Sequence, residues 1–136
     1  GHSAETFNAA TDVVKKFEHL LCGNAYWDFS KKLAVTDHFA ALSRPFPQRI
    51  SGELTSYFFD AESNIFTCNW DEKKSLSAPT LVYIPERLVV DKKDISIEPP
   101  GGIRIIPIND GSKNMLLTIS PTEKSTSRHL SIQFKQ

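Results

Sequence analysis

SYFFDAESNIFTCNW, residues 56–70, decides the fold of this chain. Tyr57 and Phe59 occupy alternate positions at its start, and Phe66, Cys68 and Trp70 alternate at its end. A repeat of two is the spacing of a β-strand, in which successive side chains point to opposite faces. The polar segment 60–64 between the two runs is rich in turn-forming residues. The stretch therefore predicts two strands joined by a turn.

The same spacing continues to the end of the chain, with turn-forming segments at 99–102, 109–112 and 120–127. Many short strands at this spacing are typical of an antiparallel β-sandwich. We therefore predict a mainly β protein with a sandwich of seven or eight strands. Phe58 and Trp70 are the aromatic residues expected to be exposed on it. The further alternating positions are Leu81 and Tyr83; Ile95 and Ile97; Ile103 and Ile105; Met115, Leu117 and Ile119; Leu130, Ile132 and Phe134.

Residues 4–43 have a different pattern. Apolar residues between Asn8 and Leu21 recur at helical spacing, and Gly23 can end that helix. Residues 24–29 are short and aromatic, which predicts a strand, and residues 36–42 predict a second helix that Pro45 terminates. This helix-strand-helix order predicts an α/β segment ahead of the sandwich.

Composition excludes several classes of function. The 136 residues carry 16 basic and 16 acidic side chains, so no net positive field exists to attract nucleic acid. His19, His38 and His129 are scattered, and Cys22 and Cys68 are far apart, which predicts neither a metal site nor a disulfide framework. We expect no cofactor. Residues 1–3, Gly-His-Ser, are typical of a tag remnant and are left out of the fold.

Four segments resemble consecutive landmarks of one enzyme family. They are AETFNAATD at 4–12, GNAYWDF at 23–29, RPFPQRISG at 44–52 and APTLVYIP at 78–85. Together they resemble the C-terminal portion of endoglycoceramidase-like enzymes of glycoside hydrolase family 5. The resemblance implies that residues 4–43 correspond to the last units of a (β/α)8 barrel, also called a TIM barrel, and residues 44–136 to a C-terminal β-sandwich.

The resemblance also implies a function and a set of site residues. The parent would be a retaining β-glycosidase acting on glycolipids, either glycosylceramide or steryl glucoside. Glu5 is the candidate nucleophile, although alignment on Phe7 places Thr6 at that position. Either the register shifts by one residue or the nucleophile has been lost. Trp27, Tyr26 and Asp28 are the candidate substrate-binding residues, because a tryptophan face can stack on a sugar ring.

The chain alone is expected to be inactive. A retaining glycosidase needs a second carboxyl group about 5 to 5.5 Å from the nucleophile, and the resemblance places that group on an upstream strand. The expected partners are therefore the missing upstream barrel and, for the parent, a glycolipid substrate with peripheral membrane contact. An open barrel strand also predicts self-association of the fragment. The alternative interpretation is a non-catalytic sandwich that serves as an interaction or carbohydrate-binding module.

Overall fold

The computed structural model describes residues 4–21 and 37–135. The chain divides into two compact units, with the boundary between Arg44 and Pro45. The first unit contains helix α1 (Ala4–His19) and helix α2 (Asp37–Leu42), which contact each other. Helix α1 begins four residues earlier than expected, because Ala4, Glu5, Ala9 and Ala10 favour helix. The strand predicted at 24–29 lies outside the described residues. Within the described ranges, no helix is long and apolar enough to cross a membrane.

A buried ion pair ties the end of α1 to the segment that leaves the first unit. Arg44 donates from Nε to Glu18 Oε1 at 2.6 Å and from Nη2 to Glu18 Oε2 at 3.0 Å. Both side chains are 4% exposed. Two parallel hydrogen bonds between arginine and a carboxylate fix the relative orientation of the groups. The arginine that opens the RPFPQ segment thus anchors the first unit internally.

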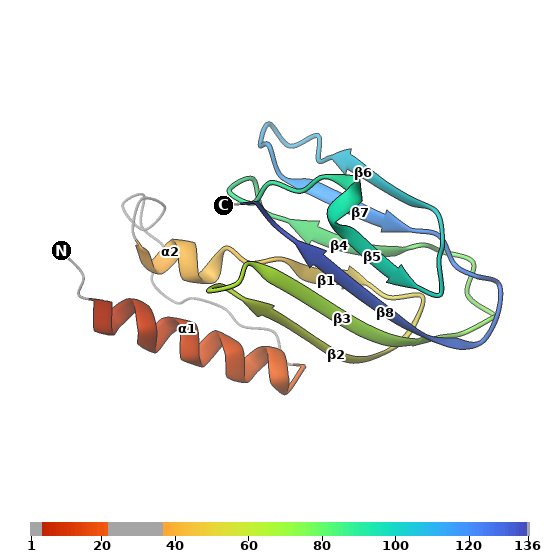
Figure 1. The fold of residues 1–136 in the computed structure, drawn as a ribbon, viewed down its shortest axis with the longest axis horizontal. Coiled ribbons are helices and arrows are strands. Elements are labelled where there is room, and N and C mark those ends of the chain that lie inside the picture. The colour runs from red at the N-terminus through yellow and green to blue at the C-terminus, as the bar shows by residue number, and fades with distance from the viewer. Residues whose placement is uncertain (1–3, 22–36, 136) are drawn as a thin grey trace. The chain divides into compact units, whose positions relative to one another are not determined.

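The second unit is the predicted antiparallel sandwich, with eight strands (Figure 1). Two four-stranded sheets lie face to face, with a short 3-10 helix (Lys92–Asp94) before β5. Sheet A has the order β1-β4-β7-β6, and sheet B has the order β2-β3-β8-β5. The strands are β1 (Phe46–Arg49), β2 (Gly52–Asp60), β3 (Ile65–Glu72), β4 (Thr80–Ile84), β5 (Ile95–Glu98), β6 (Ile103–Pro107), β7 (Met115–Ile119) and β8 (Thr126–Gln133).

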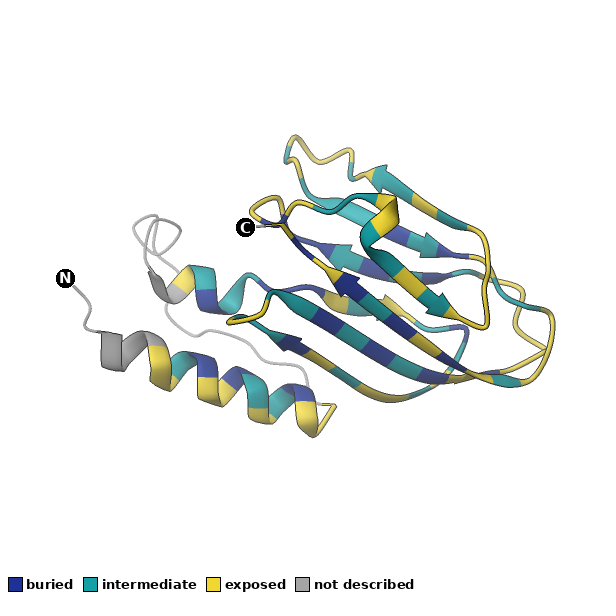
Figure 2. Cartoon of the chain, in the orientation of Figure 1, coloured by how far each residue is buried: buried dark blue, intermediate teal, exposed yellow. Residues whose placement is uncertain are grey.

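The core lies between the two sheets and follows the repeat of two. Buried and accessible residues alternate along β3 and β8 (Figure 2). Both sheets contribute side chains to a single cluster, so the alternation seen in the sequence is the inward and outward alternation of a sandwich. Its members are Phe59, Phe66, Cys68, Trp70, Val82, Ile84, Leu88, Leu117, Ile119, Leu130, Ile132 and Phe134.

Three features of the sandwich differ from the sequence-based expectation. Trp70 is 1% exposed and belongs to the core, whereas Phe58 is 38% exposed as predicted. On β4 the inward residues are Thr80, Val82 and Ile84, so Leu81 and Tyr83 face outward. Strand β1 was not expected, because Pro47 lies within it; proline is tolerated there because β1 is an edge strand.

The turn into β2 requires glycine. A Cβ atom at Gly52 would lie 2.0 Å from the backbone oxygen of Asp71 on the paired strand β3. No other amino acid fits this approach without moving the strand. The glycine that ends the RPFPQRISG segment therefore allows β2 to pair from its first residue with Glu72, the last residue of β3.

Candidate functional site

Of the four candidate residues from the sequence, the structure describes only Glu5. Glu5 lies in the first turn of α1, which differs from the strand end that the family resemblance implies. Its assignment as nucleophile stays a prediction. Tyr26, Trp27 and Asp28 lie outside the described residues. The sandwich itself carries two surfaces with distinct chemistry, one on the outer face of each sheet.

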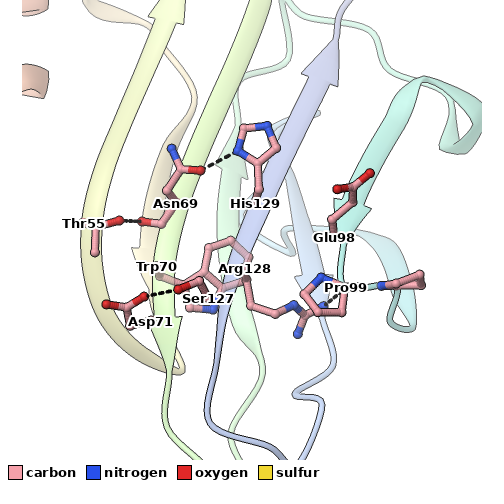
Figure 3. Close-up of a pocket in the computed structure, with 10 residues that line it drawn as sticks. Thr55, Asn69, Trp70, Asp71, Glu98, Pro99, Ser127, Arg128 and His129 are labelled. Carbon is pink, nitrogen blue, oxygen red and sulfur yellow. Dashed lines mark hydrogen bonds between the residues drawn. The ribbon is translucent and has the colours of Figure 1, made fainter.

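The outer face of sheet B carries a polar row that crosses all four strands. Ser56, Asn69, His129 and Glu98 are neighbours in register on β2, β3, β8 and β5. Asn69 donates from Nδ2 to Ser56 Oγ at 2.9 Å, and its Oδ1 is hydrogen-bonded to His129 Nδ1 (Figure 3). Because the amide oxygen accepts this bond, Nδ1 of His129 carries the proton. The side chains of Ser56, Asn69 and His129 are thereby fixed in orientation.

A pocket of about 580 Å³ opens at this row. Pro99 and Pro100 form part of its wall, and Asp71 and Ser127 line it beside the polar row. Ser127 donates from Oγ to Asp71 Oδ1 at 2.7 Å (Figure 3). The volume is within the usual range of about 300–1,000 Å³ for small-molecule sites. Size alone therefore permits a small ligand.

A buried ion pair lies next to the pocket. Arg128 donates from Nη1 to Glu72 Oε2 at 2.8 Å, and both side chains are at most 1% exposed. The guanidinium also donates to the backbone oxygens of Ser120 and Pro99 at 3.2 and 3.1 Å. Its Cζ lies 5.6 Å from the centre of the Trp70 ring, within range of a cation–π contact. One arginine thus holds strands β3 and β8 and two loops together.

Glu72 is ionised in this environment. Burial raises the pKa of its carboxyl. Hydrogen bonds from Thr122 and Arg128 and the charge of the arginine lower the pKa by more, so the net pKa lies below the ordinary value of 4.5. Thr122 donates both its backbone N–H and its Oγ1 hydrogen to Glu72 Oε1, each at 2.6 Å. The pair is therefore charged and well hydrogen-bonded, as a buried salt bridge must be to persist.

The outer face of sheet A carries an apolar row, next to a row that contains Arg49 and Arg104. Phe46, Tyr83, Leu116 and Ile106 are neighbours in register across β1, β4, β7 and β6. The rings of Phe46 and Tyr83 stack with their centres 4.9 Å apart. Burial, with the nearby charges of Asp110 and Glu86, raises the pKa of the Tyr83 phenol, which stays neutral. This row forms an apolar stripe on the outer face of the sheet.

These surfaces set what the sandwich can do chemically. Among residues 4–21 and 37–135, no group of three His, Cys, Asp or Glu side chains is placed to hold a metal ion. The polar pocket offers hydrogen-bond donors and acceptors, and the apolar row offers contact area. Neither surface was predicted, because each joins residues from four strands that are far apart in the sequence.

A family model described as the glycoside hydrolase family 5 C-terminal domain matches residues 44–133. The match covers more than half of the chain, which therefore belongs to this family. It confirms the resemblance read from the sequence. No curated protein matches the chain by sequence.

Solved structures share the fold. Endo-glycoceramidase II from Rhodococcus sp. is similar with a TM-score of 0.69 and 18% identity, over 98% of this chain and 31% of that chain. Its ganglioside GM3 complex is similar with a TM-score of 0.67 and 19% identity, over 96% of this chain and 29% of that chain. Sterylglucosidase 1 from Cryptococcus neoformans is similar with a TM-score of 0.55 and 21% identity, over 78% of this chain and 16% of that chain. At this identity the likeness shows the fold alone, and the chain spans about a third or less of each relative.

Proposed function

We propose that this chain is the C-terminal part of a retaining β-glycosidase that acts on glycolipids, glycosylceramide or steryl glucoside. The observation that carries the proposal is the family match over residues 44–133. The names of the structural relatives, an endo-glycoceramidase and a sterylglucosidase, support a glycolipid substrate. In this proposal the sandwich supports the catalytic barrel and performs no chemistry itself.

The apolar row of sheet A is the surface that fits this supporting role. Phe46 stands two residues after Arg44, so the row begins where the chain leaves the barrel-like segment. It then runs across the whole sheet through Tyr83 and Leu116. Apolar side chains left half-exposed gain about 25 cal/mol per Å² when a partner covers them. We propose that the upstream barrel covers this face.

Helix α1 supports the same interpretation. Val14 and Glu18 lie on its buried side, whereas Val13 and Leu20 are 51% and 67% exposed. Leu20 directly follows His19, the last residue of the helix, and its N–H still donates to Lys16 O at 3.0 Å, so Leu20 lies on the same side as Val13, seven residues earlier. An exposed apolar stripe on a helix is expected if further barrel elements normally pack against it, and is less expected for a closed binding module.

The glycosidase proposal is tested by activity in two contexts. The purified chain should release no fluorophore from a fluorescent β-glucoside, because it has no second catalytic carboxyl on an upstream strand. The chain extended upstream by the barrel should hydrolyse the same substrate with retention of configuration. Turnover by the 136-residue chain itself, or no turnover by a folded extended protein, would count against the proposal.

The supporting role is tested by matched substitutions on the two outer faces. Tyr83→Lys places a charge on the apolar row of sheet A, and Thr67→Lys places one on the polar face of sheet B. In the isolated chain Tyr83→Lys should lower the free energy of unfolding by about 0.5–1.5 kcal/mol more than Thr67→Lys, because it removes the stacking on Phe46. In the extended protein we expect this difference to grow by about 1–2 kcal/mol, because the charge then lies in the covered interface. An equal difference in the two proteins would show that sheet A is not the covered face.

A further inference from the structure

The pocket on the outer face of sheet B has the properties of a small-molecule site. It lies on the polar row rather than on the apolar face, so the proposed supporting role does not use it. Asn69 is held by Ser56 and His129, and Asp71 is held by Ser127. Side chains fixed in this way need little further ordering when a ligand binds.

Several polar groups of the pocket are left with capacity for further bonds. The carboxylate of Glu98 makes no hydrogen bond or ion pair with any described residue, and Asp71 uses only Oδ1 in its bond with Ser127. Nε2 of His129 is turned away from Asn69 (Figure 3). The pocket therefore offers two carboxylates and an imidazole nitrogen as acceptors, and the hydroxyl groups of a ligand can donate to each of them.

Charge and volume narrow the class of ligand. The charge of Arg128 is neutralised by Glu72, and Asp71 and Glu98 remain as uncompensated carboxylates. Their negative field disfavours phosphate, sulfate and other anions. The described residues form no metal-binding cluster. A pocket of about 580 Å³ has room for one or two sugar rings.

We propose that this pocket binds a neutral, hydroxyl-rich ligand, namely a mono- or disaccharide. The polar side chains bind the hydroxyl groups, and the Pro99 and Pro100 rings contact the C–H faces of the sugar. Binding is weak, with a Kd on the order of 1 mM, because the pocket is open and no exposed aromatic ring lines it. The site belongs to the sandwich alone and does not depend on the glycosidase proposal.

The test is titration of the 136-residue chain with lactose and methyl β-glucoside, followed by ¹⁵N–¹H NMR. We expect saturable shifts at Asn69, Asp71 and His129. Inorganic phosphate should produce no such shifts.

Substitutions complete the test. Glu98→Ala and Asp71→Ala remove exposed carboxylates, so the fold should persist and affinity should fall at least about tenfold. Thr67→Ala, on the same face outside the pocket, should leave affinity unchanged. Absence of saturable shifts up to about 100 times the expected Kd, equal binding of phosphate, or unchanged affinity in both carboxylate variants would overturn the proposal.

Discussion

The two sheets of the sandwich share one core but have opposite outer faces. Sheet A exposes the apolar row from Phe46 to Ile106, whereas the equivalent surface of sheet B carries Ser56, Asn69, His129 and Glu98. Both faces have the same strand spacing, so backbone geometry does not cause the difference. The choice of outward side chain causes it, and this choice indicates which face suits a protein partner and which face suits water or a polar ligand.

The sheets also differ in the polar groups that point inward. Sheet B buries the Arg128–Glu72 ion pair, and sheet A buries Thr80, whose Oγ1 accepts a hydrogen bond from the Ser51 backbone N–H at 3.0 Å. A buried charge is far more costly to leave unpaired than a buried hydroxyl. The stability of sheet B should therefore depend more strongly on its polar residues than that of sheet A.

The largest expected effect is that of Arg128→Ala. It leaves the Glu72 carboxylate buried without its cationic partner, and we expect a loss of about 3–5 kcal/mol in the free energy of unfolding. Urea denaturation of the 136-residue chain measures the loss. The double variant Glu72→Met/Arg128→Leu should be more stable than Arg128→Ala, because no buried charge remains. A loss below about 1 kcal/mol for the single variant would show that the pair is effectively solvated.

Acid should weaken the same region of sheet B. The pKa of Glu72 is lowered in the folded state, so its stabilising contribution is fully present above the ordinary value of 4.5 and is lost as the pH falls through the folded pKa. Thermal unfolding between pH 7 and pH 3 should therefore show a decline in Tm that is smaller in Glu72→Gln. If the two pH profiles remain parallel, other carboxyl groups cause the decline.

Sheet A should respond more mildly to loss of its inward polar group. Thr80→Val removes the acceptor for the Ser51 N–H, and Ser51 is only 2% exposed. Leaving this donor unpaired should cost about 1–3 kcal/mol. Thr118→Val, on the outer face of the same sheet, is the control and should change stability by less than about 0.5 kcal/mol. Equal losses in the two variants would show that water satisfies the Ser51 N–H.

The sequence predicted the sandwich and most of its strands because burial on one face produces a repeat of two. It did not predict which side chains of β4 point inward, because the strand sequence TLVYI has apolar residues on both faces. Trp70 was expected on the surface because its buried neighbour Arg128 could not be recognised: 58 positions separate the two residues in the chain. The polar pocket and the apolar row arise from strand register, which no local pattern specifies.

The smallest effect compares one phenylalanine from each outer face. Phe46 is 42% exposed and stacks on Tyr83, whereas Phe58 is 38% exposed and makes no ring contact with a described aromatic residue. Because their exposure is similar, the stacking should account for most of the difference between Phe46→Ala and Phe58→Ala. In the isolated chain we expect Phe46→Ala to lower the free energy of unfolding by about 0.5–1.5 kcal/mol more than Phe58→Ala does. Chemical denaturation of both variants measures this difference. If Phe58→Ala costs as much or more, the apolar row of sheet A is not a packed surface in its own right, and its aromatic residues would gain stability only from a partner that covers them.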